Sequence, residues 1–86
     1  MFVILVYDVN SSRCAKVMKI CKKYLHHVQR SVFEGMITES KLKGMRQELE
    51  RNITSDADSV CIYQVDSLKY TSKLQIGICD PESHFL

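Results

Sequence analysis

The chain has 86 residues, of which 45% are apolar and 26% charged, and its formal net charge is +2 at pH 7. A chain of this length supports one hydrophobic core, which excludes multidomain enzymes. Because such a core is thin, we expect the protein to associate with a second copy. The opening apolar run is short and ends at Asp8, so we expect no membrane span, no secretory signal and a cytoplasmic location.

The first predicted element is a strand over residues 2–7. This run of β-branched and aromatic residues is typical of a strand that is covered on both faces and is central in its sheet. Polar residues 8–12 supply turn and N-cap chemistry, so a helix should begin at Ser11 or Ser12. Its apolar residues recur at helical spacing and are Cys14, Val17, Met18, Cys21, Tyr24 and Leu25. The lysines of this helix therefore face outward together.

An alternating pattern over residues 26–38 predicts extended chain with a hairpin turn. The turn fits either at Glu34 and Gly35, because glycine tolerates a positive φ, or at Arg30 and Ser31. The sequence leaves both positions open.

A second helix is predicted after Thr38, which is a suitable N-cap, and it should end within residues 52–55. Its buried stripe is expected to contain Leu42, Met45, Leu49 and Ile53. Residues 58–65 return to a strand pattern, and residues 74–78 form a last apolar alternating stretch before Pro81.

The order of these elements, β-α-β-β-α-β, predicts an α+β domain of the ferredoxin-like type, with an antiparallel sheet and both helices on one face. We assign residues 1–66 to this core and residues 67–86 to a C-terminal strand and tail that make dimer contacts. The first strand is apolar on both faces, so a second subunit is expected to cover the other face. The strand at residues 74–78 could then extend the sheet edge of the partner subunit.

The net charge is distributed unevenly along the chain. Residues 11–30 contain six basic and no acidic side chains, so this segment carries +6 and the rest of the chain −4. The basic residues are Arg13, Lys16, Lys19, Lys22, Lys23 and Arg30. Such a segment predicts a surface that binds the phosphate backbone of nucleic acid, and a solvated helix face is the alternative.

The four cysteines, Cys14, Cys21, Cys61 and Cys79, lack the spacing of a zinc site. We interpret them as small buried hydrophobes. The adjacent His26 and His27 do not change this interpretation, because neighbours in extended chain point to opposite faces.

Asp8 is the candidate metal ligand, because it stands where an apolar central strand ends. In a face-to-face dimer two copies of Asp8 could approach each other and would repel unless a divalent cation such as Mg²⁺ lay between them. A cation there could activate water and polarise a phosphodiester. The alternative is that Asp8 is a turn residue that serves the start of the following helix.

Three stretches of the chain resemble the CRISPR-associated Cas-two family. They are Tyr7-Asp8-Val9, the specific motif VQRSVFEG at residues 28–35, and DSVCIY at residues 58–63. The similarity covers residues 2–65. It implies a ferredoxin-like homodimer that acts in CRISPR adaptation, where it bridges copies of a partner integrase during spacer acquisition while double-stranded DNA lies across it. Some members are described as metal-dependent endonucleases acting on single-stranded RNA or double-stranded DNA.

The resemblance also implies site residues. The family's metal-binding aspartate falls on Asp8, its aromatic neighbour on Tyr7, and the motif serine and phenylalanine on Ser31 and Phe33. Many relatives carry arginine in the first turn of the helix, where this chain has Cys14. Phe33 also fits core packing, and Arg30 also fits an exposed strand residue. The alternative family is a toxin-type ferredoxin-like ribonuclease of the virulence-associated D kind, against which the motif at residues 28–35 argues.

Overall fold

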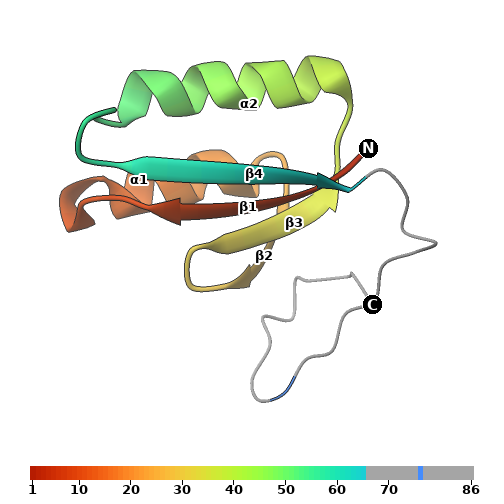
Figure 1. The fold of residues 1–86 in the computed structure, drawn as a ribbon, viewed down its shortest axis with the longest axis horizontal. Helices are drawn as coiled ribbons and strands as arrows, with labels where there is room; N and C mark the ends of the chain where they lie inside the picture. Colours follow the sequence, from red (N-terminus) through yellow and green to blue (C-terminus); the bar gives the residue numbers. More distant parts are fainter. Residues whose placement is uncertain (66–75, 77–86) are drawn as a thin grey trace.

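A computed structural model describes residues 1–65 and residue 76 (Figure 1). Its elements follow the predicted order: β1 (Phe2–Asp8), α1 (Ser11–Lys22), β2 (His26–Gln29), β3 (Val32–Met36), α2 (Glu39–Asn52) and β4 (Ser59–Val65). The predicted strand at residues 74–78 and the tail assigned to residues 67–86 lie outside the described residues, except for Ile76.

The four strands form one sheet in the order β2-β3-β1-β4, and every neighbouring pair is antiparallel. β1 therefore lies between β3 and β4, as its apolar composition predicted. Leu5 of β1 is opposite Phe33 on β3 and Ile62 on β4, so these three side chains share one face. This topology confirms the predicted ferredoxin-like α+β fold.

The core lies between that face of the sheet and the two helices. Val3, Leu5 and Phe33 are fully buried there, and α2 runs along the sheet in Figure 1. The helices contribute the buried residues Val17, Ile20, Cys21, Met45 and Leu49. Most of the predicted apolar stripes are confirmed, but Ile20 was missed. α1 ends at Lys22, before the predicted stripe residues Tyr24 and Leu25.

Both helices begin with a side-chain cap. The Asn10 side chain accepts a hydrogen bond from the Ser12 backbone N–H at 3.0 Å, and the Thr38 hydroxyl accepts one from the Lys41 N–H at 3.2 Å. Each bond satisfies an amide that would lack a partner in the first turn of a helix. The prediction of Thr38 as the cap of α2 is confirmed.

The hairpin turn lies at Arg30 and Ser31, because Gln29 pairs with Val32. Arg30 has a φ of 43°, in the left-handed region. The carbonyl oxygen of Arg30 lies 2.6 Å from Nε2 of His27, so this ring nitrogen donates to it and helps to hold the turn. The alternative turn at Glu34 and Gly35 is wrong, since Gly35 lies within β3.

The other face of the sheet carries no helix among the described residues, and we call it the open face. Its residues on β1, β3 and β4 include Ile4, Val6, Asp8, Val32, Met36, Cys61 and Tyr63. Met36 and Tyr63 are 65% and 59% exposed. The prediction that Cys61 is buried is wrong, because alternation along β4 places it opposite Val6 on this face. Cys79 lies outside the described residues.

The helices of the described chain are short and polar on their outer sides. α1 has 12 residues and α2 has 14, and neither is long and apolar enough to cross a lipid bilayer.

Candidate functional site

Asp8 is exposed at the end of β1, on the open face. It lies opposite Ser59 of β4, and the backbone N–H of the preceding Tyr7 donates to the carbonyl oxygen of Ser31 at 3.1 Å. The backbones of Ser31 and Ser59 therefore flank this end of the strand. Within residues 1–65 and 76, no group forms a hydrogen bond or ion pair with the Asp8 carboxylate.

The start of α1 does not depend on Asp8. The Asn10 side chain caps the helix, and the backbone N–H of Asn10 donates to Asp58 Oδ1 at 3.0 Å. The alternative interpretation of Asp8 as a turn residue for this helix is therefore wrong. Its carboxylate remains available to bind a ligand.

Asp58 is a buried structural carboxylate that the sequence analysis missed. Arg13 donates to it twice, from Nε at 2.5 Å and from Nη2 at 2.8 Å, and the Thr54 backbone N–H donates at 2.9 Å. The Arg13 guanidinium, together with the backbone amides of Thr54 and Asn10, holds the pKa of Asp58 well below its ordinary value. This residue ties the loop before α1 to the loop after α2. No local signal reveals it, because Arg13 and Asp58 are far apart in the sequence.

Tyr7 and Phe33 do not join Asp8. Alternation along β1 turns Tyr7 toward the helices, where it is 4% exposed, and Phe33 has no exposed surface. Their ring centroids are 6.2 Å apart, and the His27 ring stacks on Phe33 at 4.6 Å. Burial also raises the pKa of Tyr7. Both residues pack in the core, which agrees with the packing interpretation of Phe33.

The predicted basic residues take three different positions. Lys16, Lys19, Lys22 and Lys23 are exposed on or just after α1, and Arg30 is exposed in the hairpin turn. Arg13 is committed to the ion pair with Asp58. Cys14 is half-buried and donates from Sγ to the Val9 carbonyl oxygen at 3.5 Å. The lysines, and not the first turn of α1, therefore make the accessible positive surface.

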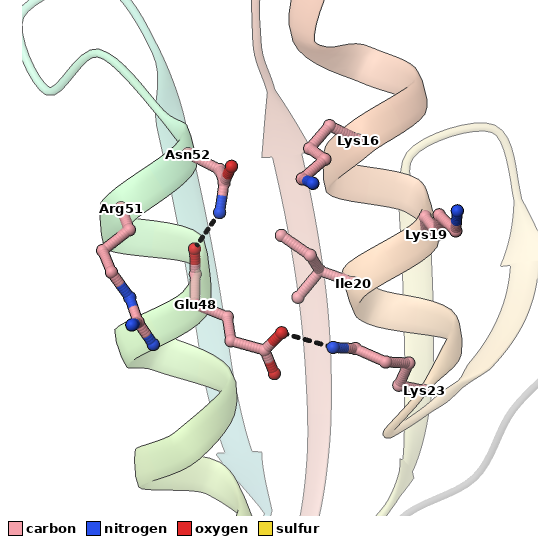
Figure 2. Close-up of a pocket in the computed structure, with 7 residues that line it drawn as sticks. All are labelled: Lys16, Lys19, Ile20, Lys23, Glu48, Arg51 and Asn52. Atoms are coloured by element: carbon pink, nitrogen blue, oxygen red, sulfur yellow. Dashed lines mark hydrogen bonds and ion pairs between the residues drawn. The ribbon is translucent and has the colours of Figure 1, made fainter.

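A cleft of about 390 Å³ lies between α1 and α2, and we call it the α1–α2 groove. Figure 2 shows the residues that line it, which are Lys16, Lys19, Ile20, Lys23, Glu48, Arg51 and Asn52. The Lys23 ammonium and the Tyr24 hydroxyl both donate to the Glu48 carboxylate. These two hydrogen bonds lower the pKa of Glu48, and the bond with Glu48 raises that of Lys23. Arg51 was missed by the sequence analysis because it lies on the other helix.

The described chain has no cluster of three or more histidine, cysteine, aspartate or glutamate side chains that could hold a metal ion. Among the described residues, Asp8 is the carboxylate at this end of β1 on the open face. A hard cation such as Mg²⁺ prefers six oxygen ligands. The donor chemistry suits magnesium, but the Asp8 carboxylate alone does not make a full set of ligands.

Comparison with known proteins agrees with the resemblance found in the sequence motifs. A sequence model of the family described as CRISPR associated protein Cas2 matches residues 1–73. A protein of Thermotoga maritima named CRISPR-associated endoribonuclease Cas2 is 42% identical over 86 residues, covering 100% of this chain and 99% of its own. One of the same name from Dictyoglomus turgidum is 44% identical over 78 residues, covering 91% and 90%.

Solved structures show the same relationship. One described as a crystal structure of Cas2 has a TM-score of 0.84 and 36% identity, and the match covers 100% of this chain and 97% of the other. Cas2 of Streptococcus pyogenes has a TM-score of 0.73 and 29% identity, with coverage of 87% and 100%. On both sequence and structure, the chain belongs to the CRISPR associated protein Cas2 family.

Proposed function

We propose that this protein is a homodimeric nucleic-acid-binding subunit of CRISPR adaptation that also cleaves phosphodiesters, acting in the cytoplasm as a magnesium-dependent endoribonuclease. The observation that carries the catalytic part is the exposed Asp8 carboxylate, which has no partner within the described residues. The name endoribonuclease, given to the relatives from T. maritima and D. turgidum, supports the same activity.

The open face supports the homodimer. Met36 and Tyr63 are large apolar side chains that are more than half exposed there, beside the half-buried Ile4 and Val6. A sheet normally buries both faces when its central strand is apolar on both. A second copy that packs against this face would bury these side chains and bring two copies of Asp8 to the same interface.

The proposed dimer would also provide a second carboxylate ligand for the metal ion. Two Asp8 carboxylates, one from each subunit, together with water and substrate phosphate oxygens, would suit the coordination that Mg²⁺ prefers. The bound cation would supply Lewis acidity and a water of lowered pKa. The protein's own contribution is to hold the two carboxylates at the ends of two rigid central strands and to bind the nucleic acid nearby.

The exposed lysines of α1 support nucleic-acid binding. Lys16, Lys19 and Lys22 carry positive charge on one helix, and Arg30 adds another in the hairpin turn. We propose that this surface holds duplex DNA while the dimer bridges copies of the partner integrase. The same surface would bind single-stranded RNA for cleavage, because both polymers present phosphates.

The catalytic proposal is tested with Asp8→Ala, and Asp56→Ala serves as the matched control. Asp56 is also an exposed aspartate, but it lies in the loop between α2 and β4. Cleavage of labelled single-stranded RNA and of duplex DNA is followed in Mg²⁺ and in EDTA. We expect Asp8→Ala to lose at least about a hundredfold in rate, because it removes the proposed metal ligand. Equal rates for Asp8→Ala and Asp56→Ala would remove Asp8 from the mechanism.

The dimer proposal is tested separately with Tyr63→Glu. A charge at this exposed position on the open face should disfavour packing against a second copy, because the charge would be desolvated. Gln64→Glu is the control, since it adds the same charge on the opposite face of β4. Sedimentation velocity should show monomers for Tyr63→Glu and dimers for Gln64→Glu. A dimer that survives Tyr63→Glu unchanged would place the interface elsewhere.

A further inference from the structure

The α1–α2 groove is lined by cations from both helices and by one carboxylate. Lys16, Lys19 and Lys23 line it from the side of α1 and Arg51 from α2, and Glu48 points across the groove toward Lys23 (Figure 2). We propose that this groove binds the phosphodiester backbone of nucleic acid and that Glu48 limits its affinity by holding Lys23. The proposal rests on the nucleic-acid binding proposed above and adds a defined site, a residue of α2 and a residue that opposes binding.

The lysine spacing matches a polymer of phosphates. Positions 16, 19 and 23 are separated by three and four residues, so their side chains share one side of the helical path. At a rise of about 1.5 Å per residue, they extend over about 10 Å. Successive phosphates of one strand in a duplex advance by about 3.4 Å along its axis. The row therefore spans about three such phosphate steps.

Most of these cations are available to an anion. In the part of the chain that the structure describes, no carboxylate forms an ion pair with Lys16 or Lys19. Arg51 donates from Nε to the uncharged Gln47 carbonyl oxygen at 3.2 Å, which leaves other guanidinium N–H groups for a ligand. Lys16 and Lys19 thus present unpaired charge on the α1 wall, and Arg51, which also interacts electrostatically with Glu48, offers N–H groups on the α2 wall.

Lys23 differs from the other cations because it already forms an ion pair with Glu48. The carboxylate accepts from the Lys23 ammonium and from the Tyr24 hydroxyl, so it takes the position at Lys23 that a phosphate oxygen would need. A phosphate that approaches Lys23 must displace this carboxylate and is repelled by its charge. Removal of the charge should therefore free a fourth cation and strengthen binding.

The lining favours nucleic acid over an acidic protein segment. Cations and an amide dominate it, and Ile20, its apolar member, is 4% exposed. Protein segments usually bind through buried aromatic or apolar anchors in a pocket, and this groove offers no such pocket. It also lies between the helices, whereas Asp8 lies on the open face. Binding in the groove therefore does not require the Asp8 carboxylate.

The first experiment compares two triple variants. Lys16→Gln, Lys19→Gln and Arg51→Gln together remove three charges from the groove. The control removes three exposed charges from α2 outside the groove, by Lys41→Gln, Lys43→Gln and Arg46→Gln. Fluorescence anisotropy measures the affinity for a labelled short duplex DNA and a single-stranded RNA, in EDTA and at several salt concentrations.

We expect the groove variant to bind at least about tenfold more weakly, and the slope of log K against log salt to fall in magnitude by about 2. The control variant should change affinity by less than about threefold, because its charges act only through the general field of the protein. Equal losses in the two variants would overturn the site. Unlabelled nucleic acid and polyglutamate are then compared as competitors at equal charge concentration. If polyglutamate displaces the labelled duplex as effectively as nucleic acid does, the assignment of the ligand is overturned.

The second experiment tests Glu48 with Glu48→Gln. The amide keeps an oxygen that can accept from Tyr24, so the contact between the helices is retained while the charge is lost. Glu50→Gln removes the same charge from the same helix outside the groove lining. We expect Glu48→Gln to tighten binding about threefold to tenfold and Glu50→Gln to change it by less than about twofold. Unchanged or weaker binding in Glu48→Gln, with an unchanged urea midpoint, would overturn the role of Glu48.

These results are separable from those for Asp8. Suppose that the groove variant binds like the wild type and that Asp8→Ala abolishes RNA cleavage. This result overturns the inference about the groove and leaves the proposed nuclease intact. A groove variant that loses affinity in EDTA supports the inference whether or not Asp8→Ala still cleaves, since binding is measured without metal.

Discussion

Phe33 offers a direct test of whether the family motif serves packing or nucleic-acid contact. It has no exposed surface and its ring stacks between those of His27 and Tyr7, with centroid distances of 4.6 and 6.2 Å. Both distances lie in the range at which aromatic pairs attract each other. A base could reach this ring only if the core opened. We therefore expect a substitution here to change stability and not affinity.

The magnitude follows from burial. Truncation of a fully buried phenylalanine to alanine costs about 3–5 kcal/mol, whereas a domain of this length has a total stability of about 4–13 kcal/mol. Phe33→Ala would therefore remove much of this stability, and would unfold the domain if its stability lies at the lower end of this range. Phe33→Leu keeps an apolar side chain of similar reach and should cost about 1–1.5 kcal/mol. It is the useful variant because most molecules remain folded.

The assay is urea unfolding followed by far-ultraviolet circular dichroism, at one fixed protein concentration, so that the proposed dimerisation would affect every midpoint equally. With a slope of about 1 kcal/mol per molar urea, Phe33→Leu should lower the midpoint by about 1 M. Its affinity for duplex DNA and RNA should stay within about twofold of the wild type. The reasoning is refuted if Phe33→Leu keeps its midpoint but loses affinity, since the ring would then contact the nucleic acid.

Three further predictions test the supporting structure. Because Arg13 depresses the pKa of Asp58, the contribution of Asp58 to stability is present above the ordinary carboxyl pKa and is lost as the pH falls below about 5. Urea midpoints measured at several pH values should therefore show a smaller acid-induced loss of stability for Asp58→Asn than for the wild type. Thr38→Ala should lower the free energy of unfolding by about 1 kcal/mol, because the α2 cap is lost, and Thr38→Ser should restore most of it in the same measurement. In the Tyr63→Glu variant, whose open face should be uncovered, Cys61 should react with iodoacetamide faster than Cys21, since Cys61 is exposed in the single subunit and burial raises the pKa of Cys21 to about 12. Peptide mapping by mass spectrometry reads both rates, and equal rates would contradict the burial of Cys21.

Local patterns in the sequence were sufficient for much of the fold. The apolar run of β1 identified the central strand, the spacing of residues such as Val17 and Met45 identified the buried sides of both helices, and the oxygen of Thr38 identified a helix start. Each of these depends on interactions within a few residues, which a pattern records directly. The same holds for Asp8, whose place at the end of an apolar strand marked it as a candidate ligand before its exposure was known.

The tertiary structure decided what depends on contacts between distant segments. The pairing of Gln29 with Val32 placed the hairpin turn at Arg30, and the packing of the helices decided which face of β1 is buried, so that Tyr7 lies in the core and Asp8 on the open face. The ion pair that commits Arg13 joins residues 45 positions apart. Arg51 and Glu48 meet the lysines of α1 only because the two helices pack side by side. Charge and periodicity describe one element at a time, whereas which charges face one another is set by the packing of the whole domain.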